Sequence, residues 1–327
     1  MKRRLYIVLP IALYVLLRVP SFVEPQWYQD EAGYASTVWL THLGYGLYIN
    51  AWNNKPPLLF GIYGLAQLLW GPSEAGIHLL GALSGLAAMI AAVWGMARLF
   101  SRRAALWGGL VAAVLVGTPI FDGNLALPES LLIGPVTVGV VWFLCSCADP
   151  EGRRPRAVTL AGIGVLLACG VLIQQTAVAD VASVVLWCLV RGRWRSIAIT
   201  GSAFVLTMAA VVVPVMASVG VQNVWFALVT SYGDYLDSSL HAQFAPFAFR
   251  IVVIVAIVAA AWANRSAHDG RLELIRIWTT GLLFAAVASG YSYEHFLLPM
   301  VLPAVMLGTG IVSRYRDRLA EGLRRRR

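Results

Sequence analysis

Apolar runs of about 20 residues recur along the whole chain, and this feature constrains its fold more than any other. A helix of about 20 apolar residues crosses the roughly 30 Å hydrocarbon core of a bilayer. Backbone groups in lipid must be satisfied internally, which helices achieve within one segment. Runs such as Val205–Val219 lack the alternation of apolar and polar residues that barrel strands show. The sequence therefore predicts an all-α integral membrane protein.

The apolar runs predict about ten transmembrane helices. One further run, Pro57–Trp70, is too short to span comfortably and ends at Gly71-Pro72, so we expect an interfacial helix in the first outer loop. The first run has no small-residue cleavage site behind it and is expected to be a retained span. The expected spans are roughly 5–23, 75–97, 104–121, 127–147, 157–175, 177–190, 196–219, 247–263, 275–290 and 296–313.

Charge is distributed unequally between the two predicted faces. The chain is 59% hydrophobic with a net charge of +9, and 22 of its 25 basic residues fall in the expected inner loops. The positive-inside rule then places both termini in the cytoplasm. This clustering excludes nucleic acid as a partner and leaves membrane lipids. Abundant arginine and scarce lysine favour a bacterial plasma membrane.

The loops predict a single membrane domain over residues 1–327. The largest outer loop is 24–74, and a second outer loop spans 220–246. Within the second loop, Ser231–Asp237 is polar, aromatic and glycine-containing, which suits a mobile lid or an acceptor loop as well as it suits a plain loop. Residues 314–327 form a basic tail on the cytoplasmic side.

Paired carboxylates, Asp30 and Glu31, follow the first span directly. Carboxylates at a bilayer edge are costly unless they are solvated or partnered. A solvated loop in which Asp30 caps a helix explains them as well as a functional pair does. Spacing alone leaves both interpretations open.

Lys55 is the only lysine outside the N-terminal cluster, and it lies on the face where basic residues are scarce. Pro56 and Pro57 stiffen the backbone behind it and favour the start of a helix. A compact ammonium at the headgroup level suits a phosphate, although an interfacial lysine that snorkels has the same signature.

Four motifs on the outer face together resemble membrane glycosyltransferases of the GT-C class. Specifically, they resemble the bacterial relatives of dolichyl-phosphate-mannose protein mannosyltransferases and of the lipid A aminoarabinose transferase. The motifs are Asp30-Glu31-x-x-Tyr34-Ala35 with Lys55-Pro56-Pro57, Gly123-Asn124-x-x-x-Pro128-Glu129, Ile173-Gln174-Gln175-Thr176, and Tyr291-Ser292-Tyr293-Glu294-His295-Phe296. Relatives often carry a basic residue where Gln174 stands, and many carry an additional soluble domain.

The resemblance implies an inverting transferase that moves a sugar from a polyprenyl-phosphate donor to a hydroxyl of a lipid, glycan or protein on the extracytoplasmic side. It implies Asp30 as general base, with Glu31 beside it as the second catalytic candidate. It implies phosphate binding by Lys55, Arg250 and His295. The expected contacts to the donor sugar or the acceptor are Glu129, Asn124, Gln174, Gln175, Tyr293 and Glu294.

No obligatory metal ion is expected, although a divalent cation is possible. Asp30, Glu31, Asp122 and Glu129 supply the hard oxygen ligands that such an ion prefers. For Arg18, within the first span, a structural role is favoured.

Two other functions fit parts of the sequence. A transporter for a lipid-linked or anionic solute would use Arg18, Asp180 and Gln174-Gln175 as a path, but transporters usually show two related halves with sites near the midplane. An inactive GT-C-like scaffold subunit is the second, against which the intact Asp30-Glu31 and Lys55-Pro56-Pro57 argue. No motif of the sequence assigns the sugar, the acceptor or the oligomeric state.

Overall fold

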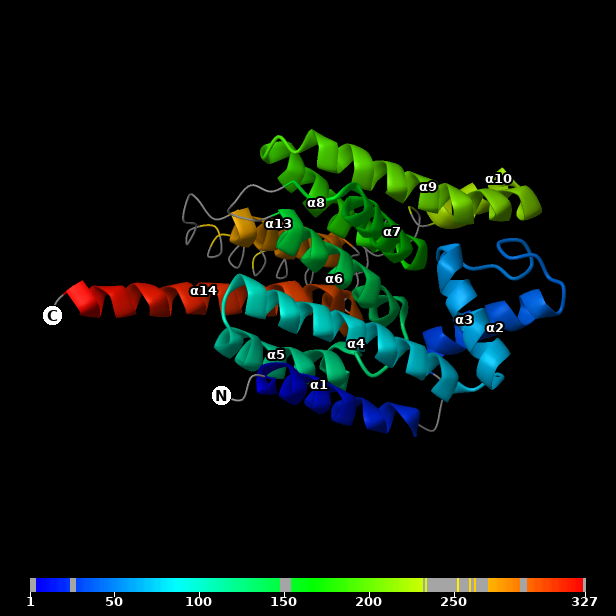
Figure 1. The fold of residues 1–327 in the computed structure, drawn as a ribbon. Helices are drawn as coiled ribbons and strands as arrows, with labels where there is room; N and C mark the ends of the chain where they lie inside the picture. The colour runs from blue at the N-terminus through cyan, green and yellow to red at the C-terminus, as the bar shows by residue number, and fades with distance from the viewer. Residues whose placement is uncertain are drawn as a thin grey trace.

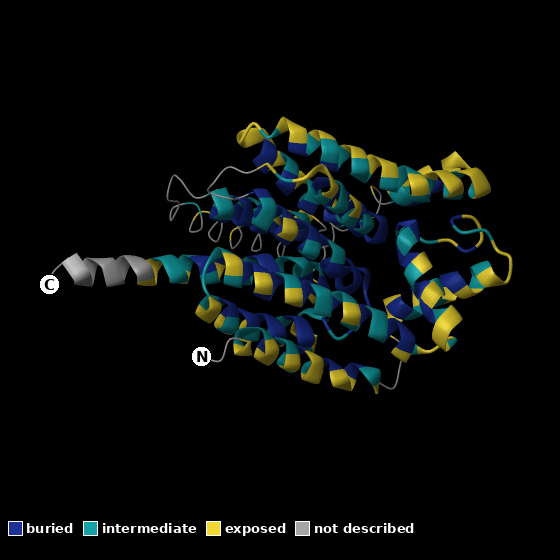
Figure 2. Ribbon diagram, viewed as in Figure 1, coloured by how far each residue is buried: buried dark blue, intermediate teal, exposed yellow. Residues whose placement is uncertain are grey.

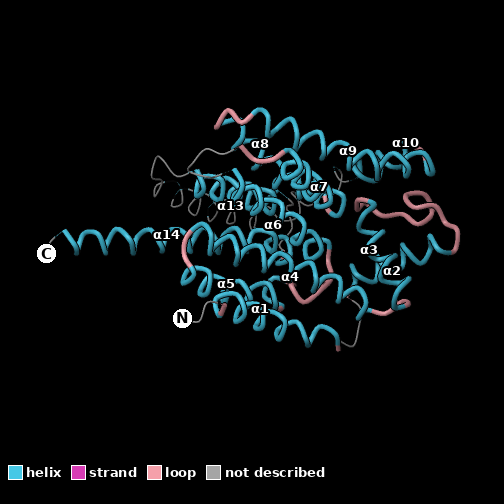
Figure 3. Tube along the Cα trace, in the orientation of Figure 1, coloured by secondary structure: helices cyan, strands magenta, loops and turns pink. Residues whose placement is uncertain are grey.

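The computed structural model describes residues 4–23, 28–147, 154–231, 270–288 and 293–325, with single residues at 233, 252, 259 and 262. Within these ranges every regular element is a helix, joined by loops that include one isolated bridge between Leu47 and Ala51 (Figure 3). The predicted all-α fold is confirmed. The predicted span 247–263 with Arg250, and most of the expected lid, lie outside the described residues.

The helices fall close to the predicted spans. In chain order they are α1 (Leu5–Arg18), η1 (Val19–Phe22), α2 (Gln29–His42), α3 (Pro57–Trp70), α4 (Glu74–Leu99), α5 (Arg102–Gly117), η2 (Pro119–Phe121), α6 (Pro128–Cys147), α7 (Ala157–Ile173), η3 (Gln175–Ala177), α8 (Val178–Val190), α9 (Trp194–Val219), α10 (Val221–Trp225), η4 (Phe226–Thr230), α13 (Gly270–Ala288), η5 (Glu294–Leu297) and α14 (Leu298–Arg325).

Five helical segments in the described part of the chain are long and apolar enough to cross a membrane. They are Leu5–Phe22, Glu74–Leu99, Pro128–Cys147, Trp194–Val219 and Glu294–Arg316. The shorter apolar helices include α3, which begins at Pro57 and ends at Trp70, as the sequence predicts. Proline at the first position favours this start, and Gly71 ends the helix with a φ of 71°.

Helix α6 lies at the centre of the bundle and buries most of its side chains (Figure 2). It packs against α4 on one side and α7 on another, while α1 packs against α5 and α9 against α7. Small residues allow these close approaches. A Cβ on Gly134 of α6 would lie only 2.5 Å from Ser84 Oγ of α4, and one on Gly164 of α7 only 2.3 Å from Thr200 O of α9. Close packing of this kind holds helices together in lipid.

Helices α2 and α3 cap one end of the bundle, whereas the two chain ends lie toward the other end (Figure 1). The loop between α2 and α3, residues 43–56, is compact. Tyr48 has a φ of 66° and donates its N–H to Ala51 O, and Gly46 O accepts three backbone N–H groups. This loop presents Trp52–Lys55 to the neighbouring helices.

Two boundaries differ from the sequence expectation. Helix α14 continues through Arg325, where a tail was expected from residue 314. Residues such as Arg, Leu, Ala and Glu favour helix without any need for apolar surface, so the helix outlasts the hydrophobic run. The expected outer loop 220–246 likewise begins as helix, in α10 and η4.

Candidate active site

A polar cleft of about 500 Å³ lies where the capping helices meet the bundle. Four separate stretches of the chain line it: the start of α2, the loop before α3, the first turn of α6, and the segment that opens α14. The lining residues are Tyr28, Gln29, Asp30, Gly33, Tyr34, Trp52, Asn53, Asn54, Lys55, Glu129, Tyr293, His295 and Phe296.

Asp30 is the second residue of α2 and is exposed to the cleft. It does not cap the helix, because α2 begins at Gln29 and Tyr28 occupies the cap position. Its carboxylate makes no hydrogen bond to the part of the chain that the structure describes. A carboxylate near a helix N-terminus that is open to a cleft is suited to accept a proton from a bound hydroxyl.

Lys55 faces the same cleft, and its backbone is fixed from two sides. Its N–H donates to Asn53 Oδ1 at 3.2 Å, and its carbonyl accepts from the Tyr48 hydroxyl at 2.8 Å. Burial lowers the pKa of the Lys55 ammonium, while the carboxylates of Glu129 and Asp30 raise it in part. The ammonium therefore lies in a site whose charges favour its protonated form, next to the space where a ligand would enter.

Glu129 lies in the first turn of α6 and is buried. Its Oε1 accepts a hydrogen bond of 3.0 Å from Nε2 of Gln174, which is fully buried. The next residue, Gln175, donates through Nε2 to Asn54 O at 2.7 Å. The break between α7 and α8 thus ties together Glu129 and the loop that carries Lys55. Both glutamines, which the resemblance predicts as contacts of the donor sugar or acceptor, donate through Nε2 to protein atoms, and no hydrogen bond from the described residues reaches either Oε1.

His295 completes the cleft at the entrance to α14. Its Nδ1 lies 3.2 Å from Asp122 Oδ2, so Nδ1 carries a hydrogen toward the carboxylate. The Tyr293 ring stacks on the imidazole, with centroids 5.4 Å apart and planes 8° apart. Asp122 adopts a left-handed conformation with a φ of 52°, which an aspartate tolerates better than most residues.

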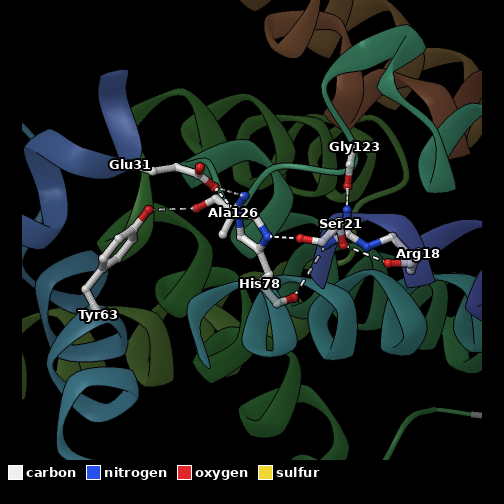
Figure 4. A network of polar contacts seen from close by, with 7 residues as sticks. All are labelled: Arg18, Ser21, Glu31, Tyr63, His78, Gly123 and Ala126. Carbon is white, nitrogen blue, oxygen red and sulfur yellow. Dashed lines mark hydrogen bonds and ion pairs between the residues drawn. The ribbon is translucent and has the colours of Figure 1, made fainter. Parts of the chain in front are cut away.

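Glu31, the neighbour of Asp30, points away from the cleft into a buried polar network (Figure 4). Its Oε1 lies 3.0 Å from His78 Nε2 and accepts the backbone N–H of Ala126. His78 Nδ1 faces the carbonyl of Ser21. Because a carbonyl only accepts, Nδ1 carries a hydrogen, and one further proton is shared between Nε2 and Glu31. The pair is neutral overall, which suits its buried place.

Arg18 and Tyr63 complete this network (Figure 4). The guanidinium of Arg18 is buried and donates to the carbonyls of Gly123 and His78, and the Tyr63 hydroxyl donates to Ala126 O at 3.1 Å. The network therefore fixes the loop 123–126, which leads from Asp122 to α6. The structural role expected for Arg18 agrees with these contacts.

The remaining predicted residues lie around the cleft rather than in it. Glu294 opens η5 and is exposed, and Asn124 lies partly buried in the loop before α6. Neither lines the cleft. In the described ranges, no three His, Cys, Asp or Glu side chains gather as a metal ligand set. The four carboxylates named as possible ligands are divided, because Glu31 is engaged by His78.

Sequence reasoning missed several residues that the structure brings to the site. His78 lies 47 residues from Glu31 along the chain, inside an apolar helix, and no local pattern connects the two. Tyr34 has no role of its own in the sequence interpretation, and Asn53 and Asn54 belong to none of the four motifs, yet all three line the cleft. Asp122 was considered as a metal ligand, whereas it pairs with His295.

A sequence model of the family described as dolichyl-phosphate-mannose-protein mannosyltransferase matches residues 54–220, just over half of the 327-residue chain. No curated protein matches the sequence. The fold is similar to that of ArnT from Cupriavidus metallidurans. With undecaprenyl phosphate bound to ArnT, the TM-score is 0.70 and the identity 19%, over 95% of this chain and 61% of that one.

The apo state of the same ArnT gives a TM-score of 0.66 with 18% identity, over 94% of this chain and 60% of that chain. The Archaeoglobus fulgidus oligosaccharyltransferase, in a complex with Zn and sulfate, gives 0.58 with 11% identity, over 96% of this chain and 49% of that one. The chain thus spans about three fifths of the length of the ArnT structures. These likenesses show the GT-C fold.

Proposed function

This chain belongs to the dolichyl-phosphate-mannose-protein mannosyltransferase family, and on that premise we propose that it is an inverting glycosyltransferase that uses a polyprenyl-phosphate sugar. One observation carries the proposal. Asp30, whose carboxylate hydrogen-bonds to none of the described residues, and the ammonium of Lys55 come from separate segments and line one polar cleft. This pairs a base for an acceptor hydroxyl with a cation for a phosphate.

The proposed reaction is a single displacement at the anomeric carbon. The acceptor oxygen attacks that carbon from the face opposite the phosphate, and Asp30 takes the hydroxyl proton. The bond from the anomeric carbon to the phosphate oxygen breaks, and its electron pair leaves with the polyprenyl phosphate. Attack from the opposite face inverts the anomeric centre.

Lys55 and His295 are proposed to stabilise the leaving phosphate, on which negative charge develops. The proximity of Glu129 and Asp30 favours the protonated ammonium of Lys55. His295 is oriented by Asp122 on Nδ1, and its protonated form would donate from Nε2 to the phosphate. Arg250, the third predicted phosphate ligand, lies outside the described residues.

We place the cleft on the extracytoplasmic side of a bacterial plasma membrane, with both termini cytoplasmic. The inner loops hold 22 of the 25 basic residues, and the chain ends lie at the end of the bundle opposite α2 and α3 (Figure 1). The acceptor is proposed to be a hydroxyl of a lipid, glycan or protein. No obligatory metal ion is proposed, because Lys55 and His295 can meet the phosphate charge, and turnover with and without a chelator tests this point.

The contacts of the buried polar residues do not favour a transporter. Asp180 accepts a hydrogen bond from Trp278 Nε1, Gln174 holds Glu129, and Arg18 holds two backbone carbonyls. Each of these side chains thus joins one part of the protein to another. A solute path would require polar groups that face a continuous passage.

The test is turnover in detergent with a panel of radiolabelled polyprenyl-phosphate sugars. We expect hydrolysis or transfer from one donor, and its loss in Asp30→Asn with the fold retained. Glu273→Gln, which changes a carboxylate of α13 that does not line the cleft, is the control and should keep most of the activity. A folded protein that binds none of the donors would contradict the proposal.

A further inference from the structure

A second cavity, of about 390 Å³, lies between α5 and α14, far along both helices from the catalytic cleft. The two helices share a defined orientation, because Asp122 just beyond α5 pairs with His295 just before α14. Arg316 follows His295 by 21 residues. At 1.5 Å per helical residue this is about 30 Å, the thickness of a hydrocarbon core.

The groove is divided into an apolar part and a basic end. Trp107 and Val111 of α5 line the apolar part, together with Val305 and Val312 of α14. The other end of the groove is basic. It is bordered by Arg103 at the start of α5 and Arg316 of α14, together with Ser101 and Ser313. Arg103 lies one helical turn before Trp107, so the charge and the apolar surface share one face of α5.

The groove exists because α14 carries a glycine where the two helices part. Gly308 is exposed, and a Cβ built on it would meet no atom within 4 Å. Gly108 of α5, by contrast, is tightly covered by α14. A Cβ on Gly108 would lie only 2.6 Å from Oγ1 of Thr309, the residue after Gly308. The helices therefore touch at Gly108 and leave open space beside Gly308.

We propose that this groove binds one anionic phospholipid of the inner leaflet. Its phosphate would contact Arg103 and Arg316, and one acyl chain would lie along Trp107 and Val111. An apolar groove that ends in two guanidinium groups at the membrane surface matches an anionic amphiphile. Free phosphate could use only the basic end, and a zwitterionic lipid would bring a second positive charge to the arginines.

Thermal unfolding of the full chain in uncharged detergent tests the proposal. We expect phosphatidylglycerol to raise the Tm in a saturable way. Phosphatidylcholine with the same acyl chains should raise it far less, and inorganic phosphate should leave it unchanged. Equal stabilisation by both lipids, or by phosphate alone, would overturn the assignment.

Two variants separate this groove from general lipid solvation. Gly308→Leu places a side chain in the groove from a position where a Cβ meets no atom within 4 Å, and Arg103→Gln removes one exposed charge, so each should raise the half-saturating lipid concentration by about fivefold or more. Gly201→Leu and Arg154→Gln are the controls. Gly201 on α9 also has open space at its Cβ, and Arg154 is an exposed arginine of another inner loop. If the controls weaken binding as much as Gly308→Leu and Arg103→Gln do, the groove is not the site.

Discussion

Glu31 Oε1 and His78 Nε2 lie 3.0 Å apart in the protein interior, although Glu31 is the chain neighbour of Asp30, which lines the cleft. Successive residues of a helix point about 100° apart, which here directs Asp30 and Glu31 to different surroundings. Asp30 faces the cleft, and Glu31 anchors the loop 123–126 through Ala126. The paired motif thus combines the proposed general base, Asp30, with a residue that holds a loop in place, Glu31.

Removing one partner of the Glu31–His78 pair should destabilise the protein more than removing both. Glu31→Leu or His78→Leu leaves a polar or charged group buried alone, at a cost of about 3–5 kcal/mol. The double variant removes both groups and should cost clearly less than the sum. The free energy of unfolding in mixed micelles measures the cycle, and additive losses would show that the two side chains are not coupled.

Asp30→Asn should lower the turnover rate strongly while leaving the fold and donor binding intact. Loss of a general base lowers kcat by about 10²- to 10⁴-fold. Because Asp30 is exposed and hydrogen-bonds to none of the described residues, the Tm of the Asp30→Asn variant should stay close to that of the native chain. Steady-state kinetics and donor binding check the two parts, and a large rise in the donor Kd with unchanged kcat would contradict the role.

Donor affinity should fall as the pH rises through the lowered pKa of Lys55. Below that pKa the side chain is an ammonium that binds phosphate, and above it the charge is lost. Since burial lowers the pKa from 10.5, the fall should come before that pH. Lys55→Arg should remove this fall, because a guanidinium stays charged.

The carboxylate of Glu129 raises the pKa of Lys55, so Glu129→Gln should move the fall in donor affinity to lower pH. Binding of a polyprenyl phosphate, measured from pH 6 to pH 10, gives the pH at which affinity falls by half in the native chain and in Glu129→Gln. Coincident midpoints would show that Glu129 does not influence the ammonium.

Gln175→Leu should raise the donor KM more than it lowers kcat. Gln175 holds the carbonyl of Asn54, the residue before Lys55, and its loss frees the loop that presents the ammonium. Gln67→Leu is a matched control, because Gln67 donates a similar bond of 2.9 Å to Ala35 O without lining the cleft. Parallel losses in both variants would indicate general destabilisation rather than a positioning role.

Gly164→Ala should lower the Tm, whereas Gly201→Ala should leave it unchanged or raise it slightly. A Cβ on Gly164 would lie 2.3 Å from the backbone oxygen of Thr200, which α7 and α9 cannot accommodate without moving apart. Gly201 has no atom within 4 Å of that position, and alanine favours helix by about 0.5–1 kcal/mol. Thermal unfolding of the two variants in detergent checks the contrast.

Much of the fold follows from the sequence, because a chain in lipid needs long apolar helices, and the length of each apolar run predicts the length of its helix. The predicted spans 127–147 and 177–190 begin one residue before α6 and α8 and end at the same residues as these helices. The limits of α14 could not be read in the same way, since its last residues are helical without being apolar. Hydrophobicity reports burial in lipid, whereas helix propensity continues beyond it.

The sequence by itself determined the helical membrane fold. Asp30 and Lys55 are conspicuous in it because charged residues near apolar spans are costly, whereas Glu129 and His295 are candidates through the motifs that resemble GT-C transferases. Only the tertiary structure decided what each side chain touches. His78 is far from Glu31 along the chain, and Gln174 is 45 residues from Glu129. Hydrogen bonds between distant helices depend on how those helices pack and rotate, and no local pattern of residues records that arrangement.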